Sequence, residues 1–296
     1  MINVSVVCPL KNSEGKLDTL RKVIFNQKEV NVSEVIFPVT ESDDNTAEKA
    51  KMFEKSRVFC VENALFSHSI VREKAIRIAK ENIVIVISDD IDSNDENLFY
   101  KLAKDIDEDK SIALSFARQV SMHRGIEKYI REINYPTVTK ITSKEDIEIM
   151  GLKAFFASDV CMAYNKNTFL DLGGYDDLDL PTNEDMYFAK KVLLSDHKVK
   201  YNSEAVVIHS HKYTLKALYR RYYEVGRFFG MCPEFKNYKV NKSGFSLSLA
   251  VFKKILCRFD IISLFCFIPN MLARYLGKKH GQKYELKRRN SKWKRF

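Results

Sequence analysis

The first 120 residues alternate short apolar runs with amphipathic stretches, and this alternation restricts the possible folds more than any other feature. The apolar runs are rich in β-branched and aromatic residues, which favours buried strands. We predict such strands at residues 4–8, 35–39, 83–87 and 112–116. The stretches between them predict helices at residues 17–26, 46–55 and 69–81. This order predicts an α/β fold with a mostly parallel central sheet flanked by helices.

Sheets of this kind bind ligands at the carboxyl ends of their strands, so the residues that follow each strand are the first candidates for a site. The sequence has neither GxGxxG nor GxxxxGK[ST], which argues against a Rossmann dinucleotide site and a P-loop. It also lacks GxSxG and HExxH, which argues against the common esterases and zinc proteases.

The cysteines and the N-terminus indicate a cytoplasmic location. The six cysteines form no CxxC pair, and several lie inside apolar runs, as expected of reduced, buried thiols. The first residues have no basic region and no cleavage site, so we expect no secretion signal.

The C-terminal part of the chain has a different composition. Residues 245–276 are apolar, and the last twenty residues contain nine Lys or Arg and one Glu, in a chain of net charge +10. The longest apolar run, residues 261–268, is far shorter than the roughly 20 residues that span a bilayer. We therefore predict a main domain, residues 1–230, and a helical amphipathic extension with a basic tail, residues 231–296.

An amphipathic helix next to a basic segment is typical of proteins that lie on an anionic membrane. We expect peripheral association with the inner face of the cell membrane. One alternative is that the apolar block only packs onto the main domain. Another is that the tail binds nucleic acid, but the sequence has no nucleic-acid-binding motif.

Carboxylates cluster directly after the predicted strand 83–87, in the sequence Ser88-Asp89-Asp90-Ile91-Asp92. Carboxylates at the end of a buried strand suit a hard divalent cation, which can neutralise a diphosphate leaving group. A solvated acidic turn is the alternative interpretation.

Two further motifs follow later in the chain. Glu184 and Asp185 open a helical pattern, where a carboxylate can act as a general base or as an ordinary helix cap. His209 and His211 follow a strand-like run, and an extended backbone places both imidazoles on one face. They are either metal ligands or structural histidines.

Short motifs that occur in one order along the chain resemble a known family. They lie at residues 66–72, 88–90, 116–119, 134–136, 155–161, 173–175, 183–185, 209–213 and 220–222. From Phe66 to about Gly230 the chain resembles the inverting family 2 glycosyltransferases, and among them the bacterial rhamnosyltransferase-like branch. The resemblance implies a GT-A fold, a nucleotide-sugar donor, a divalent cation (Mn²⁺ or Mg²⁺) and inversion by a single displacement.

The resemblance also implies roles for particular residues. Asp90 and His209 would be the metal ligands, with Asp92 and His211 as further candidates. The catalytic base would be Asp185. The residues with roles in substrate binding would be Glu184 for the acceptor and, for the nucleotide-sugar, Pro9, Glu41, His68, Arg72, Asp89, Arg118, Gln119, Asp159, Arg220 and Arg221.

Three positions depart from the family pattern. Val39 stands where an Asp is usual after the second strand, and Glu41 is expected to take its place. Glu73 replaces the usual Asn after the arginine, and Ser88 replaces the first Asp of an Asp-x-Asp motif.

The resemblance implies transfer of L-rhamnose from dTDP-L-rhamnose onto a lipid-linked saccharide during surface polysaccharide synthesis. Transfer of galactose, glucose or galactofuranose by the same fold is the alternative within the family. A catalytically dead nucleotide-sugar binder is a third hypothesis, motivated by Val39 and Glu73. The retained Asp90, Asp185 and His209 argue against it.

Overall fold

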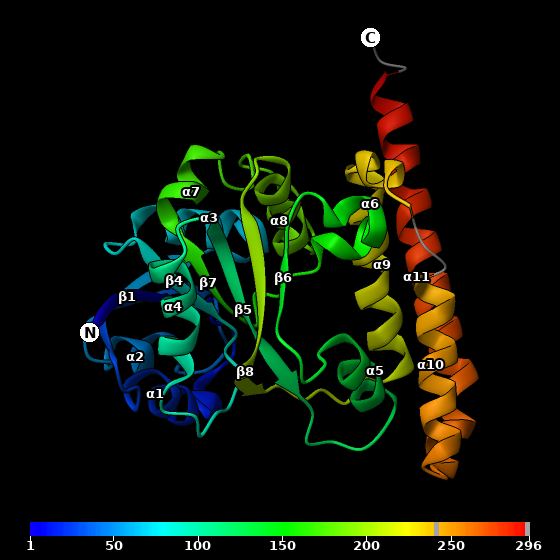
Figure 1. Cartoon of the computed structure of the whole chain (residues 1–296), viewed down its shortest axis with the longest axis horizontal. Coiled ribbons are helices and arrows are strands. Elements are labelled where there is room, and N and C mark those ends of the chain that lie inside the picture. The colour runs from blue at the N-terminus through cyan, green and yellow to red at the C-terminus, as the bar shows by residue number, and fades with distance from the viewer. Residues whose placement is uncertain (240–242, 294–296) are drawn as a thin grey trace.

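The computed structural model describes residues 1–239 and 243–293. Within them, eight strands form one sheet with the order β3-β2-β1-β4-β7-β5-β8-β6 (Figure 1). The strands are β1 (Ile2–Val7), β2 (Val30–Thr40), β3 (Ser56–Val61), β4 (Ile83–Ile87), β5 (Ile112–Val120), β6 (Lys140–Thr142), β7 (Cys161–Asn165) and β8 (Lys198–Ile208). Strands β6 and β7 pair antiparallel with their neighbours and the other pairs are parallel, which confirms the predicted, mostly parallel α/β fold.

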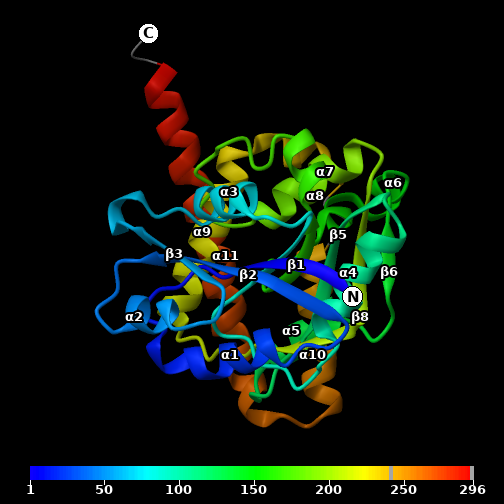
Figure 2. The ribbon, with the colours of Figure 1, turned by 90° about the vertical axis from the view of Figure 1, so that its left-hand side faces the viewer.

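Helices cover both faces of this sheet, as Figure 2 shows. Those of the main domain are α1 (Leu17–Phe25), α2 (Thr46–Lys51), α3 (His68–Ile78), α4 (Leu98–Glu108), α5 (Ile126–Asn134), α6 (Asp146–Met150), α7 (Lys166–Asp171), α8 (Glu184–Leu194) and α9 (Leu215–Met231). In β4, Ile85 and Ile87 pack into one apolar core while Val84 and Val86 pack into the other. Burial on both faces explains why the central strands are continuous apolar runs.

Three strands, β3, β6 and β7, are missing from those predicted from the sequence, and β6 has only three residues. The edge strand β3 is only partly buried and has no clear alternation of apolar and polar residues, so its sequence gives a weak signal. Strand β7 is fully buried, but its Cys-Met-Ala-Tyr-Asn sequence contains no β-branched residue.

The topology brings several functional segments to one edge of the sheet. Strand β7 lies antiparallel between β4 and β5, so β4 and β5 run in the same direction, as do β1 and β8. The segments that follow β1, β4, β5 and β8 therefore meet at the carboxyl edge. The backbone of Asp92 exchanges two hydrogen bonds with Ile208, at 2.9 and 2.7 Å, and ties the acidic turn to the end of β8.

The C-terminal part forms two helices, α10 (Ser243–Cys257) and α11 (Ile261–Trp293). Val251 and Ile255 of α10 pack against Ile126 and Tyr129 of α5 in a small apolar core. Helix α11 runs beside α9, as Figure 1 shows. Up to Trp293, the segment expected as a basic tail is a helical continuation of α11. No helix in the described part of the chain has the length and apolar content needed to cross a bilayer.

Glycines let α9 and α11 approach each other closely. A Cβ atom added at Gly226 would overlap the backbone carbonyl of Lys278, and one added at Gly281 would overlap that of Tyr223. A side chain at either position would push the two helices apart. The small residues therefore fix how α11 lies on the main domain.

We predict that two Gly→Ala substitutions affect the free energy of unfolding differently. Alanine has the higher helix propensity, by roughly 1 kcal/mol in a helix interior. Gly226→Ala should nevertheless lower the free energy of unfolding by about 1–3 kcal/mol, because the new methyl group overpacks the helix contact. Gly15, which has no atom within 4 Å of a built Cβ, is the control, and Gly15→Ala should not destabilise the protein. Denaturant titration measures both, and a stabilised Gly226→Ala would contradict the close contact.

Candidate active site

A cavity of about 1200 Å³ opens at the carboxyl edge of the sheet. Eleven of the residues singled out in the sequence line it, together with aromatic and basic side chains from both halves of the chain. The eleven are Pro9, His68, Arg72, Asp89, Asp90, Asp159, Glu184, Asp185, His209, His211 and Arg221. The sequence motifs therefore converge on one cavity.

Three of the candidate metal ligands lie together in this cavity. The Asp90 Oδ1 and Oδ2 atoms lie 3.3 Å from His209 Nε2 and 3.3 Å from His211 Nε2, respectively. The two imidazole nitrogens are 2.7 Å apart. All three ligand atoms lie within 4.8 Å of one another, so one cation could contact them all. The exposed Asp92 side chain is not part of this cluster.

The electrostatic environment holds the cluster in a metal-binding protonation state. Burial raises the pKa of Asp90, but the hydrogen bond to His209 and the charges around it outweigh burial and lower that pKa to about 2. Burial and the neighbouring His209 lower the pKa of His211 to about 4. At neutral pH the cluster thus offers an ionised carboxylate and two neutral imidazoles, a donor set that fits Mn²⁺ or a similar divalent cation.

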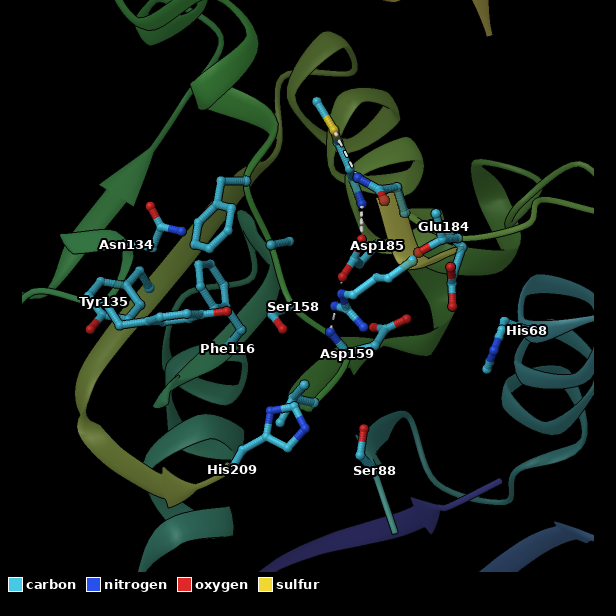
Figure 3. Close-up of a pocket in the computed structure, with 18 of the residues that line it drawn as sticks. His68, Ser88, Phe116, Asn134, Tyr135, Ser158, Asp159, Glu184, Asp185 and His209 are labelled. Atoms are coloured by element: carbon cyan, nitrogen blue, oxygen red, sulfur yellow. Dashed lines mark hydrogen bonds between the residues drawn. The ribbon is translucent and has the colours of Figure 1, made fainter. Parts of the chain in front are cut away.

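Three carboxylates and one arginine form a second, buried cluster. Arg72, from α3, donates a hydrogen bond to Glu184, and its guanidinium lies 3.8 Å from Asp159 Oδ2. The Asp159 backbone N–H donates to Asp185 Oδ2 at 3.3 Å. Figure 3 shows Asp185 reaching from the start of α8 into the centre of the pocket, beside Asp159.

Crowding of these carboxylates changes their proton affinities. Burial, followed by the charges of Asp159 and Glu184, raises the pKa of Asp185 well above its usual range. Burial raises the pKa of Asp159 to about 6, although Arg72 opposes the shift. Asp185 is therefore the carboxylate with the environment of a proton acceptor.

Five predicted residues lie outside the cavity lining: Asp92, Glu41, Arg118, Gln119 and Arg220. Glu41 accepts a hydrogen bond from the backbone N–H of Asn63, near the exposed edge of the sheet. Arg220 is exposed on α9. Gln119 is buried behind His209, with its Oε1 atom 3.0 Å from His209 Nδ1.

The sequence interpretation missed two features of the cavity. Lys16 forms a 2.8 Å ion pair with Asp89, and no local motif marks this lysine. The second feature is an aromatic wall, formed by Phe116, Tyr135, Phe156 and Tyr201. Their rings contact one another, with centroids 5.3 Å apart for Phe116 and Tyr201 and 5.4 Å apart for Tyr135 and Phe156. Figure 3 places Phe116 and Tyr135 across the pocket from His68 and Glu184.

The fold matches solved glycosyltransferases and is the GT-A fold. The structure of TarS residues 1–349 from S. aureus superposes with a TM-score of 0.56 at 16% identity, over 98% of this chain and 92% of that one. The mannosyltransferase PcManGT from Pyrobaculum calidifontis, solved with GDP-Man and Mn²⁺, gives a TM-score of 0.58 at 14% identity, over 93% and 87% of the two chains.

The sequence comparisons establish the family. The profile of "Glycosyl transferase family 2" matches residues 5–173, more than half of the chain. The chain therefore belongs to glycosyl transferase family 2. It is 30% identical over 211 residues to the O-antigen chain rhamnosyltransferase WbaN of Salmonella anatum, across 70% of this chain and 66% of WbaN, just under two thirds. It is 27% identical over 240 residues to RfbN, an O-antigen chain rhamnosyltransferase of Salmonella typhimurium, across 78% and 74%. This confirms the rhamnosyltransferase-like resemblance.

We predict that Asp90, His209 and His211 bind Mn²⁺ together. Because each contributes one ligand atom, Asp90→Ala should abolish Mn²⁺ binding in isothermal titration calorimetry, and His211→Ala should weaken it by roughly 10-fold or more. Asp92→Ala removes a nearby carboxylate that is not part of the cluster and is the matched control. Unchanged binding by Asp90→Ala, or equal losses in Asp90→Ala and Asp92→Ala, would rule out this ligand set.

Proposed function

We propose that this protein is an inverting, metal-dependent transferase that moves L-rhamnose from dTDP-L-rhamnose onto a lipid-linked saccharide in bacterial surface polysaccharide synthesis. The O-antigen rhamnosyltransferases among its relatives support the sugar and the pathway class. The observation that carries the reaction type is the position of Asp185, which Figure 3 shows beyond Asp159, on the other side of the pocket from His209 of the candidate metal cluster. Base and leaving group on opposite sides of a reacting carbon are what inversion requires.

The donor diphosphate would lie beside the metal cluster. A divalent cation held by Asp90, His209 and His211 would neutralise the charge that develops on the leaving nucleoside diphosphate. Arg221 and Lys16, which line the same cavity, would add positive charge next to it. These groups stabilise the transition state more than the ground state, because the leaving charge grows during bond cleavage.

Asp185 would take the proton of the acceptor hydroxyl as that hydroxyl attacks the anomeric carbon. Its raised pKa suits this role, because a general base works best when its pKa approaches the working pH. Arg72 holds Glu184 and faces Asp159, and so compensates the negative charge that surrounds the base.

The aromatic wall would receive the acceptor saccharide. It lines the same cavity as Asp185, and within it Phe156 is 39% exposed although it is a large apolar side chain. Exposed aromatic rings offer flat apolar faces against which the C–H faces of sugars can pack.

The proposal predicts that the protein transfers rhamnose from dTDP-L-rhamnose to a polyprenyl-diphosphate-linked saccharide in the presence of Mn²⁺, and that the product has the inverted anomer by NMR. Asp185→Asn keeps the shape but removes the proton acceptor, so transfer should fall by roughly 10²-fold or more while donor affinity is retained. Glu184→Gln, in the next position, should be less impaired.

Other donors make this test decisive. Faster transfer from UDP-galactose, UDP-glucose or UDP-galactofuranose would replace rhamnose by that sugar within the same fold. Binding of a nucleotide-sugar without any transfer or hydrolysis would favour a catalytically dead binder. A fully active Asp185→Asn would assign the base to another carboxylate.

We also propose that α10 and α11 hold the enzyme on the cytoplasmic face of an anionic membrane. One stripe of α11 faces solvent, at the helical spacing of residues 261, 265, 268, 272, 275, 279 and 283. Its first part is apolar, with Ile261, Phe265 and Ile268 between 65% and 80% exposed. Its second part carries the exposed Lys279 and Lys283. A helix that lies flat would thus offer apolar and basic contacts on one side.

The two parts of the stripe should respond differently to salt in liposome sedimentation. Lys279→Gln with Lys283→Gln should weaken binding to anionic vesicles by about 1 kcal/mol per lysine at low salt, and high salt should mask this loss. Phe265→Ser with Ile268→Ser should weaken binding at every salt concentration, because apolar burial is not screened.

The matched control is Lys22→Gln with Lys51→Gln, which removes the same charge from α1 and α2. These helices lie on the other side of the molecule from α10 and α11 (Figure 1), so this variant should bind vesicles like the wild type. No sedimentation, or equal sedimentation with neutral and anionic vesicles, would contradict the proposal and favour an extension that only packs on the main domain.

A further inference from the structure

Gln119 lies behind the candidate metal cluster and does not line the cavity. Its side chain is buried, and the residue is outside the cavity lining. Strand β5 places it opposite Val207 of β8, two residues before His209. Because side chains two residues apart on a strand share a face, Gln119 lies on the same side of the sheet as the imidazole of His209.

The four partners of the Gln119 amide determine its orientation. Its Oε1 atom accepts a hydrogen bond from Arg131 Nη1, and its Nε2 atom donates to the hydroxyls of Tyr135 at 2.6 Å and Ser158 at 2.7 Å. A guanidinium group can only donate hydrogen bonds. The amide atom that faces Arg131 must therefore be the carbonyl oxygen, and a flipped amide would place two donors against each other.

This orientation determines which nitrogen of His209 carries the proton. The same Oε1 atom lies 3.0 Å from His209 Nδ1. A carbonyl oxygen only accepts, so Nδ1 must carry the hydrogen, and in a neutral imidazole the other nitrogen, Nε2, then has the free lone pair. That nitrogen faces Asp90 Oδ1 at 3.3 Å.

We propose that Gln119 is a positioning residue that, held by Arg131, locks His209 in the Nδ1–H tautomer and aims its Nε2 lone pair at the cation. The inference rests on the proposed metal-dependent function. It replaces the role as a sugar-contacting residue that the family resemblance implied for Gln119. Partners of this kind behind a metal ligand typically contribute 10–100-fold to metal affinity.

The first experiment reads the tautomer directly, without substrate or metal. Long-range ¹H–¹⁵N NMR of the full-length protein separates protonated from unprotonated ring nitrogens, and the chain has only six histidines to assign by single substitution. We expect His209 with a protonated Nδ1 and an unprotonated Nε2. A His209 signal with the proton on Nε2 would overturn the proposal.

The second experiment measures Mn²⁺ affinity by isothermal titration calorimetry in the absence of donor. Gln119→Leu should weaken binding by about 10–100-fold, whereas Gln119→Glu keeps an acceptor oxygen for His209 and Arg131 and should bind within a few fold of the wild type. Arg131→Met leaves every atom of Gln119 in place but frees the amide to flip, so it should also weaken binding.

Gln27→Leu is the matched control, because Gln27 is a half-buried glutamine whose amide bonds the backbone of Val23, Asp95 and Phe99 away from the cavity. The Mn²⁺ affinity of this variant should be unchanged. Wild-type Mn²⁺ affinity in Gln119→Leu together with a raised KM for the donor would overturn the proposal in favour of a sugar contact. If Gln119→Leu does not fold, Arg131→Met and the tautomer measurement decide the question. If the wild-type protein transferred no sugar from any donor but the Mn²⁺ affinities of the variants followed the expected pattern, the proposed reaction would be rejected. The role of Gln119 would then still be supported.

Discussion

The pairing between β5 and β8 is the constraint on which the site depends. Its register shifts between Ala117, which pairs with Asn202, and Arg118, which pairs with Val206. The extra residues in β8 bring Gln119 level with Val207 and place His209 just beyond Val120. Irregular pairings of this kind re-aim the side chains that follow them. Without the shift, the histidines would end several residues away from the acidic turn after β4.

A second requirement is compensation of buried charge. Asp159, Glu184 and Asp185 lie close together in a region where an isolated carboxylate would be costly to bury. Although burial acts against it, the charges of Glu184 and Asp159 raise the pKa of Arg72, so this arginine stays charged. Burial is the main reason that the pKa of Asp185 is raised, and one cation for three carboxylates, which leaves the group short of positive charge, raises it further. The burial and crowding of these carboxylates thus make Asp185 a stronger proton acceptor.

The sequence predicted the parts of this site that follow strands. Asp90 and His209 each come directly after an apolar run, and the carboxyl ends of parallel strands share one edge, so their meeting could be anticipated. The position of Gln119 behind His209 could not, because it depends on the β5–β8 register shift, which no local pattern encodes. The pairing of α9 with α11 was also hidden, because Gly226 and Gly281 signal a close contact only once the partner helix is known.

The C-terminal helices connect to the site through α5. Glu127 of α5 accepts a hydrogen bond from Arg274 of α11, and Glu132 accepts from Lys254 of α10 and from Arg258, which directly follows α10. Arg131, between these two glutamates in sequence, is the residue that holds the Gln119 amide. These ion pairs attach α5, the helix that carries Arg131, to the C-terminal extension. Helix α10 also lines the cavity, with Ser246, Leu247 and Ala250, so the extension forms part of the architecture of the candidate site although it lies far along the chain from the acidic turn.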